Sequence, residues 1–133
     1  MVDTAQIIYD YLSASGTNLY DQCGTRIWTP VAPNDWANAD PCVIFNESSS
    51  GAHYSGATIR SLFNFKCYGG SSQYGNEATV FRYLYDRLHA TTKTVASGTI
   101  VSAQLVSANQ LPPEPDTQFH SYQSSFAITF ASE

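Results

Sequence analysis

The chain has 133 residues, which suits one domain that spans residues 1–133 and buries a core of ordinary size. Only 13% of the residues are charged, about half the usual share, and the net charge is −5. The six basic residues are dispersed, so the sequence lacks the clustered positive charge that nucleic acids and anionic membrane surfaces select, and we expect neither as a partner.

A first helix of about ten residues is predicted from Asp3 or Thr4, which can cap it, to a position before Gly16. Its apolar stripe has helical spacing and consists of Ala5, Ile7, Ile8, Tyr11 and Leu12. A polar turn is expected over residues 16–23. A short strand over residues 25–29 precedes a proline-containing loop that extends to residue 40.

Two further strands are predicted over residues 42–46 and 59–68. In the second, Ser61, Phe63, Phe65 and Cys67 alternate with polar neighbours, which predicts that these four face the helices. The Ser/Gly-rich residues 46–58 between the strands are expected to form a long loop, far longer than a usual hairpin connection. That length favours a contact role for the loop.

The clearest amphipathic helix is predicted over residues 73–89, after a Gly69-Gly70 turn that favours positive φ angles. A linker then leads to a strand over 99–106, with Val101, Ala103 and Leu105 inward. Prolines make residues 107–118 a stiff loop, and a last strand over 119–130 places the aromatic and β-branched side chains Phe126, Ile128 and Phe130 on one face. The order α-β-β-β-α-β-β predicts an α+β domain: a mostly antiparallel sheet of four to five strands, with two helices packed on one face.

Signals for chemistry are sparse. The three histidines are dispersed, and the sequence shows no metal-ligand spacing, calcium loop or phosphate loop, so we expect no catalytic, metal-binding or cofactor-binding residues. The three cysteines are odd in number and widely spaced, which does not indicate a disulfide framework, and Cys42 and Cys67 lie in apolar runs typical of buried thiols. Cys23, in the predicted polar turn, leaves open a small cysteine-dependent enzyme as an alternative.

Nine tyrosines combined with few charges are typical of protein interfaces, although a neutral, polar surface of no special role has the same composition. Tyr83 lies off the apolar stripe of its helix, and His53 and Tyr54 lie in the Ser/Gly-rich loop. These residues are therefore candidate partner contacts. A monomeric ligand-binding module remains a further alternative.

Three stretches resemble the tail terminator (tail completion) proteins of long-tailed bacteriophages. The first is the short strand and proline loop, Ile27-Trp28-Thr29-Pro30 through Pro33. The second joins Leu62-Phe63-Asn64-Phe65-Lys66-Cys67-Tyr68-Gly69 to the helix Val80-Phe81-Arg82-Tyr83-Leu84-Tyr85-Asp86-Arg87-Leu88-His89. The third is Glu114-Pro115-Asp116-Thr117, ahead of the closing strand.

This resemblance implies a non-enzymatic virion protein, made in the host cytoplasm, that forms a homohexameric ring in the neck of the particle. Such a ring sits on the last ring of tail tube protein, ends tube polymerisation and presents a joining surface to the head connector or stopper protein. A head-completion or stopper protein of the same neck is the nearest alternative. The interface residues expected on this reading are His53, Tyr54, Tyr83, Pro113, Glu114 and Asp116.

Overall fold

A computed structural model of the protein describes residues 3–33, 40–70, 76–111 and 120–131. The helices are α1 (Thr4–Leu12), α2 (Asn18–Cys23) and α3 (Asn76–Leu88). The strands are β1 (Ile27–Trp28), β2 (Cys42–Ser55), β3 (Thr58–Tyr68), β4 (Lys93–Val95), β5 (Gly98–Leu111) and β6 (Ser121–Ala131).

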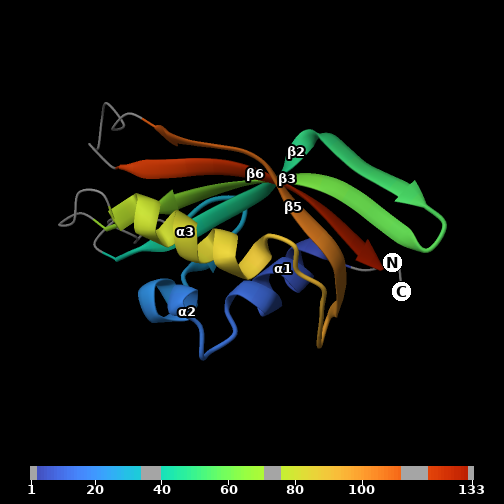
Figure 1. Ribbon diagram of the computed structural model, residues 1–133, viewed down its shortest axis with the longest axis horizontal. Helices are drawn as coiled ribbons and strands as arrows, with labels where there is room; N and C mark the ends of the chain where they lie inside the picture. Colours follow the sequence, from blue (N-terminus) through green and yellow to red (C-terminus); the bar gives the residue numbers. More distant parts are fainter. Residues whose placement is uncertain (1–2, 34–39, 71–75, 112–119, 132–133) are drawn as a thin grey trace.

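The strands form one sheet in the order β1-β2-β3-β6-β5-β4. Every neighbouring pair is antiparallel except β1 and β2, which are parallel. Figure 1 shows the three helices on one side of this sheet. The predicted α+β class, with a mostly antiparallel sheet covered by helices on one face, is therefore confirmed. The described residues contain six strands and three helices, so the predicted four to five strands and two helices were too few.

Helix α1 agrees with its predicted bounds and stripe. The Asp3 side chain caps it by accepting a hydrogen bond from the backbone N–H of Gln6 at 3.1 Å, and Ile7, Ile8, Tyr11 and Leu12 are buried.

The predicted polar turn over 16–23 is wrong, because it contains helix α2. Thr17 caps α2 by accepting from the N–H of Tyr20 at 3.0 Å, and Leu19 and Cys23, four residues apart, are buried on one face. Six residues are too few for a helix to be stable alone, so packing against the rest of the fold stabilises α2.

The predicted long loop over 46–58 is also wrong. Strand β2 continues through it to Ser55, and β3 begins at Thr58, so only Gly56 and Ala57 form the turn. A register shift between Glu47 and Ala52 marks an irregularity within this β2–β3 hairpin. Figure 1 shows the hairpin extending beyond the helices at the right of the view.

The core lies between the helices and the inward side chains of β2, β3 and β6. The predicted inward faces of β3 and β6 are confirmed, and their phenylalanines form one aromatic cluster. The ring of Phe65 stacks on Phe45 with centroids 5.7 Å apart and meets Phe126 edge-on at 5.6 Å, while Phe63 meets Phe130 edge-on at 6.1 Å.

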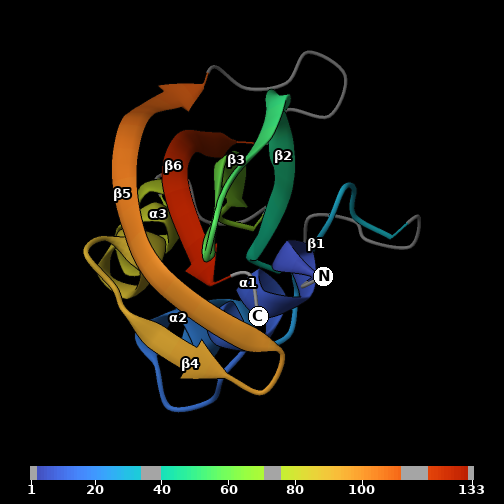
Figure 2. The same cartoon turned by 90° about the vertical axis from the view of Figure 1, so that its right-hand side faces the viewer.

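Strand β5 is longer than predicted and follows a different alternation. Ile100 and Ala103 are buried, whereas Val101, predicted to face inward, is 38% exposed. The register of β5 against β6 shifts between Ile100 and Ser102, which turns Val101 outward. Figure 2 shows how strongly β5 curves around the sheet.

The linker predicted after the second amphipathic helix contains the short strand β4, which pairs with Gly98 to Ile100. Residues 107–111, predicted as loop, belong to β5. The remainder of that loop, 112–118, and the first residues predicted for the helix at 73–89 lie outside the described residues.

Candidate interaction surface

The turn end of the β2–β3 hairpin presents two of the predicted contact residues to solvent. His53 and Tyr54 are both exposed, and the Tyr54 ring retains 63% of its accessible area. Cross-strand pairing of His53 with Arg60 and of Tyr54 with Ile59 holds them on an ordered strand rather than on a loop. Their accessibility agrees with a contact role, which remains a prediction.

Tyr83 is differently placed. It is half-buried in α3, packs against the hydrophobic core, and has the Arg82 guanidinium carbon 6.0 Å from its ring centroid. Figure 1 places α3 and the turn of the hairpin toward opposite ends of the molecule. The structure therefore does not bring Tyr83 together with His53 and Tyr54. Pro113, Glu114 and Asp116 lie outside the described residues.

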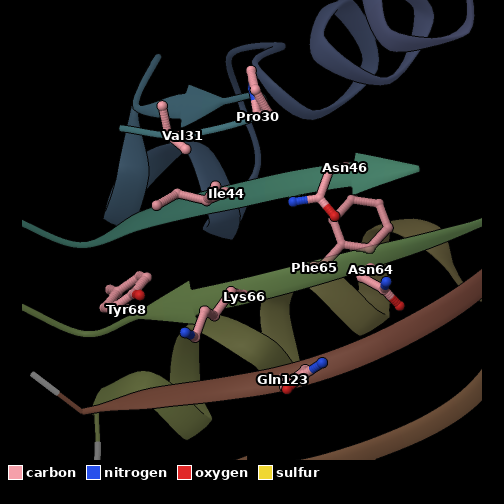
Figure 3. A pocket seen from close by; sticks show the side chains of 9 residues that line it. All are labelled: Pro30, Val31, Ile44, Asn46, Asn64, Phe65, Lys66, Tyr68 and Gln123. Carbon is pink, nitrogen blue, oxygen red and sulfur yellow. The ribbon is translucent and has the colours of Figure 1, made fainter. Parts of the chain in front are cut away.

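The sheet face opposite the helices, here called the outer face, carries a groove that sequence reasoning missed. It encloses about 350 Å³ beside the segment after β1 (Figure 3). Its lining residues come from four separate parts of the chain: Pro30, Val31, Ile44, Asn46, Asn64, Phe65, Lys66, Tyr68 and Gln123. Val31 is 72% exposed, and the Lys66 ammonium lies 5.7 Å from the centroid of the Tyr68 ring.

A second groove of about 290 Å³ lies at the base of the hairpin on the same face. It is lined by His53, Arg60, Ser61, Leu62, Val106 and Ala127. Val106 is 58% exposed. Among the described residues, the two outer-face grooves are lined by the cations of Arg60 and Lys66 and by no carboxylate. Amides, apolar side chains and scattered cations suit recognition of a protein surface with exposed carboxylates or backbone carbonyls.

A third groove lies on the helix side, between α3 and strands β5 and β6. It encloses about 340 Å³ and is lined by Ala78, Phe81, Arg82, Tyr85, Leu105 and Tyr122. We call it the aromatic groove.

The alternative of a cysteine-dependent enzyme requires Cys23 as an accessible nucleophile, and the structure buries this residue. Cys23 is fully buried on the inner side of α2, and desolvation raises its pKa from the ordinary value of 9.0 to about 12, despite the opposing effect of nearby Arg26. Burial also raises the pKa values of Cys42 and Cys67. At neutral pH these thiols are protonated and shielded, which is the opposite of what a nucleophilic cysteine requires.

This burial predicts how the protein responds to thiol reagents and to alkali. None of the three cysteines should react with a thiol reagent at pH 8 until denaturant is added. Because the folded state keeps the Cys23 thiol protonated to a higher pH than the unfolded chain does, the contribution of this thiol to stability is fully present below pH 9 and is lost between pH 9 and about 12. Over that range, the loss of stability from the Cys23 thiol has a slope of about 1.4 kcal/mol per pH unit.

Titration of accessible thiols, and urea unfolding at several alkaline pH values, measure these effects. A Cys23→Ala variant should show a shallower alkaline loss of stability. Rapid labelling of one cysteine in the folded protein would contradict the burial argument.

Within the described ranges, no group of three histidine, cysteine or acidic side chains is arranged to hold a metal ion. No described helix is both long enough and apolar enough to cross a membrane.

Comparison with protein-family models gives no match, and comparison with curated proteins gives none either. Among solved structures, the protein is similar to a chain in the virion of a native gene transfer agent (GTA) particle. The TM-score is 0.71, and the alignment covers 96% of this chain and 93% of that chain at 13% sequence identity. At that identity the likeness establishes a shared fold across nearly the whole length of both chains.

Proposed function

We propose that this protein is a non-enzymatic structural component of a phage-like virion. In this proposal it is a subunit of a six-membered ring at the head-proximal end of the tail. The ring ends polymerisation of the tail tube and provides the surface to which the head joins. The observation that carries the proposal is the fold shared, nearly end to end, with a chain of a gene transfer agent virion.

The surface chemistry supports an assembled protein. Among the residues that the structure describes, four large hydrophobic side chains are substantially exposed: Val31, Tyr54, Val101 and Val106. Three of them lie on strands β2 and β5. Aromatic and aliphatic groups set among amides, with few charges, are the composition of surfaces that bury themselves against a partner.

The partners follow from the proposed position. Copies of the chain contact one another around the ring, one side of the ring meets tail tube protein, and the other meets the head connector or stopper protein. The β2–β3 hairpin extends past the helices (Figure 1). Its residues His53 and Tyr54 are exposed, so we assign the hairpin to one of the two end contacts.

Native mass spectrometry of the purified chain, alone and with tail tube protein, tests the proposal. A closed six-subunit ring that halts tube growth, seen as tubes of defined length by electron microscopy, is the expected result. A monomer that persists in the presence of tube protein would overturn it. Rings that bind a head connector but leave tube length unchanged would favour a stopper protein instead.

The hairpin assignment predicts a separation of assembly from joining. Replacing both His53 and Tyr54 with serine should leave the thermal unfolding temperature and the ring mass unchanged, because both side chains are exposed. Joining of heads to tails, or binding of the ring to tube protein, should fall at least about tenfold if Tyr54 anchors that contact.

The matched control is Lys93→Ser together with Thr94→Ser, two exposed positions on β4. This pair should leave both joining and tube binding intact. Unchanged joining and tube binding in the hairpin variant would remove the hairpin from the end contacts.

A further inference from the structure

The groove at the base of the β2–β3 hairpin, here called the hairpin groove, combines polar with apolar side chains. His53 of β2 lies directly opposite Arg60 of β3, and residues opposite each other in an antiparallel pair place their side chains on the same face. Leu62 of β3 is likewise opposite Ala127 of β6, and Val106 of β5 completes the lining. The hairpin groove therefore offers N–H donors beside aliphatic surface.

Arg60 gives the hairpin groove a positive charge, although the chain as a whole has a net charge of −5. Strands β3, β5 and β6 contain no aspartate or glutamate. Strand β2 contains Glu47, but Glu47 lies opposite the core residue Phe63, and its Oε2 atom accepts a 2.5 Å hydrogen bond from Ser61 Oγ. The Glu47 carboxylate therefore lies on the inner face of the hairpin, whereas Arg60 is on the outer face.

The other described carboxylates of this chain lie away from the hairpin groove. Most are on or beside the helices, which cover the opposite face of the sheet (Figure 1). They belong to Asp3, Asp10, Asp21, Glu77 and Asp86. Asp40 precedes β2, at the end of that strand remote from the hairpin turn. Within the described part of the chain, no carboxylate is placed to neutralise Arg60, so a carboxylate of another molecule is complementary to this groove.

A carboxylate on an aliphatic stem matches both parts of the hairpin groove. A guanidinium binds a carboxylate through two parallel N–H donors, and such charge-assisted bonds are stronger than neutral ones. The imidazole of His53 supplies a further N–H, and Leu62 and the 58% exposed Val106 can pack on the methylene groups of the stem. Nucleic acids select clustered cations, whereas Arg60 is the single guanidinium among the described lining residues, so the chemistry favours a protein partner.

We propose that the hairpin groove receives a glutamate or aspartate side chain of the protein that meets the hairpin end of the ring, with Arg60 as its anchor. The proposal rests on the proposed function, because it names the chemistry of one end contact of that ring. Tyr54 lies opposite the buried Ile59 and does not line the groove. The hairpin contact therefore has an electrostatic side at Arg60 and an aromatic side at Tyr54.

Reversing the charge of Arg60 tests the proposal on the assembled protein. Polymerised tail tube protein and head connector protein serve as separate probes. Arg60→Glu should weaken binding to one of these two probes about tenfold or more, because two carboxylates then meet in the groove. Ring mass and unfolding temperature should not change, since Arg60 is exposed. Lys93→Glu, at an exposed position on β4, is the matched charge reversal and should leave both probes bound as by the parent.

Conservative variants and salt separate an electrostatic role of Arg60 from simple packing. Arg60→Lys keeps the charge without the paired donors, so its affinity should lie between those of the parent and Arg60→Gln. Raising the potassium chloride concentration should weaken binding by the parent, and the dependence on salt should be shallower for Arg60→Gln. Equal losses in the lysine and glutamine variants, with no dependence on salt, would show that Arg60 acts by packing and would overturn the proposal.

A compensating charge reversal on the probe identifies the occupant. The exposed acidic residues of the tube or connector protein are changed to lysine one at a time and tested against Arg60→Glu rings. One of these changes should restore binding to Arg60→Glu while weakening binding to the parent. If none restores binding, the groove does not receive a carboxylate of that protein.

The remaining outcomes distinguish the two proposals and the rival occupants. If Arg60→Glu rings bind both probes as the parent does, the inference fails and the proposed function stands. If the substitution dissolves the ring, the occupant is a second copy, and if it abolishes binding of duplex DNA by the parent, the occupant is a phosphate. If Glu133→Gln strengthens probe binding, the end of the same chain fills the groove. If the parent forms no ring and binds neither probe, both proposals fail.

Discussion

Replacing Phe65 with alanine is expected to lower the free energy of unfolding by about 3–5 kcal/mol, the usual cost of removing a buried phenylalanine. Phe65 is fully buried and lies at the centre of the aromatic cluster, stacked on Phe45 and edge-on to Phe126. Its removal leaves a cavity between β2, β3 and β6. Small domains are stable by only about 5–15 kcal/mol, so this one change removes a large part of the total.

Urea unfolding followed by tryptophan fluorescence measures the loss. Phe65→Leu is the matched control, because it keeps an apolar side chain of similar reach and should lose distinctly less stability. Tyr54→Ala, an exposed aromatic on a neighbouring strand, should lie within about 0.5 kcal/mol of the parent. A Phe65→Ala variant no less stable than Phe65→Leu would show that the aromatic cluster does not make the expected contribution to the free energy of unfolding.

The elements that could be predicted from sequence are those with a pattern of buried side chains that repeats along the element. Strands β3 and β6 were predicted because their side chains alternate over many residues between a buried and a solvent-facing side. Helices α1 and α3 were predicted because several apolar residues repeat at helical spacing. In each case the signal is local and is repeated along the element.

The elements that were missed lack such a repeated signal. Helix α2 is a single capped turn and a half, whose helical state depends on burying Leu19 and Cys23. The distal half of β2 has a Ser/Gly composition that disfavours strands, and its conformation comes from pairing with β3. The outward position of Val101 depends on a register shift, which no alternation within β5 reveals.

The candidate contacts divide in the same way. His53 and Tyr54 were identified from an assumed loop, and they are exposed on a hairpin, so the expected accessibility is right and the expected local structure is wrong. The grooves were missed because each joins residues distant in sequence, as with Ile44, Lys66 and Gln123 on the outer face (Figure 3). Only the tertiary arrangement brings such residues together.

Gly69→Ala is the second change with a large expected effect, about 3 kcal/mol of lost stability. The sequence assigned the Gly69-Gly70 pair to a turn with positive φ, and Gly70 does adopt a φ of +91°. Gly69 has a different constraint, because the start of α3 packs directly against it. A Cβ added there would lie 2.7 Å from the carbonyl carbon of Asn76 and closer still to the backbone nitrogen of Glu77.

Both obstructing atoms belong to backbone, so no side-chain rotation relieves the overlap. The first turn of α3 must move away, which strains the 2.8 Å hydrogen bond from Asn76 Nδ2 to the Gly69 carbonyl and disturbs the fully buried Glu77. Glu77 Oε2 accepts a 2.5 Å hydrogen bond from Gln110 Nε2 of β5, so the displacement reaches the strand beside the aromatic groove.

Gly16→Ala separates this steric effect from backbone strain. Gly16 has a φ of +88° and nothing within 4 Å of an added Cβ, so alanine there costs only the strain of a left-handed residue, about 1–2 kcal/mol. Urea unfolding of the two variants should rank Gly69→Ala as the less stable. Hydrogen exchange should show faster opening of the first turn of α3 in that variant alone. Equal losses of stability from the two substitutions would mean that the first turn of α3 can shift without a further loss of stability. The close approach of Gly69 would then not fix the helix against the sheet.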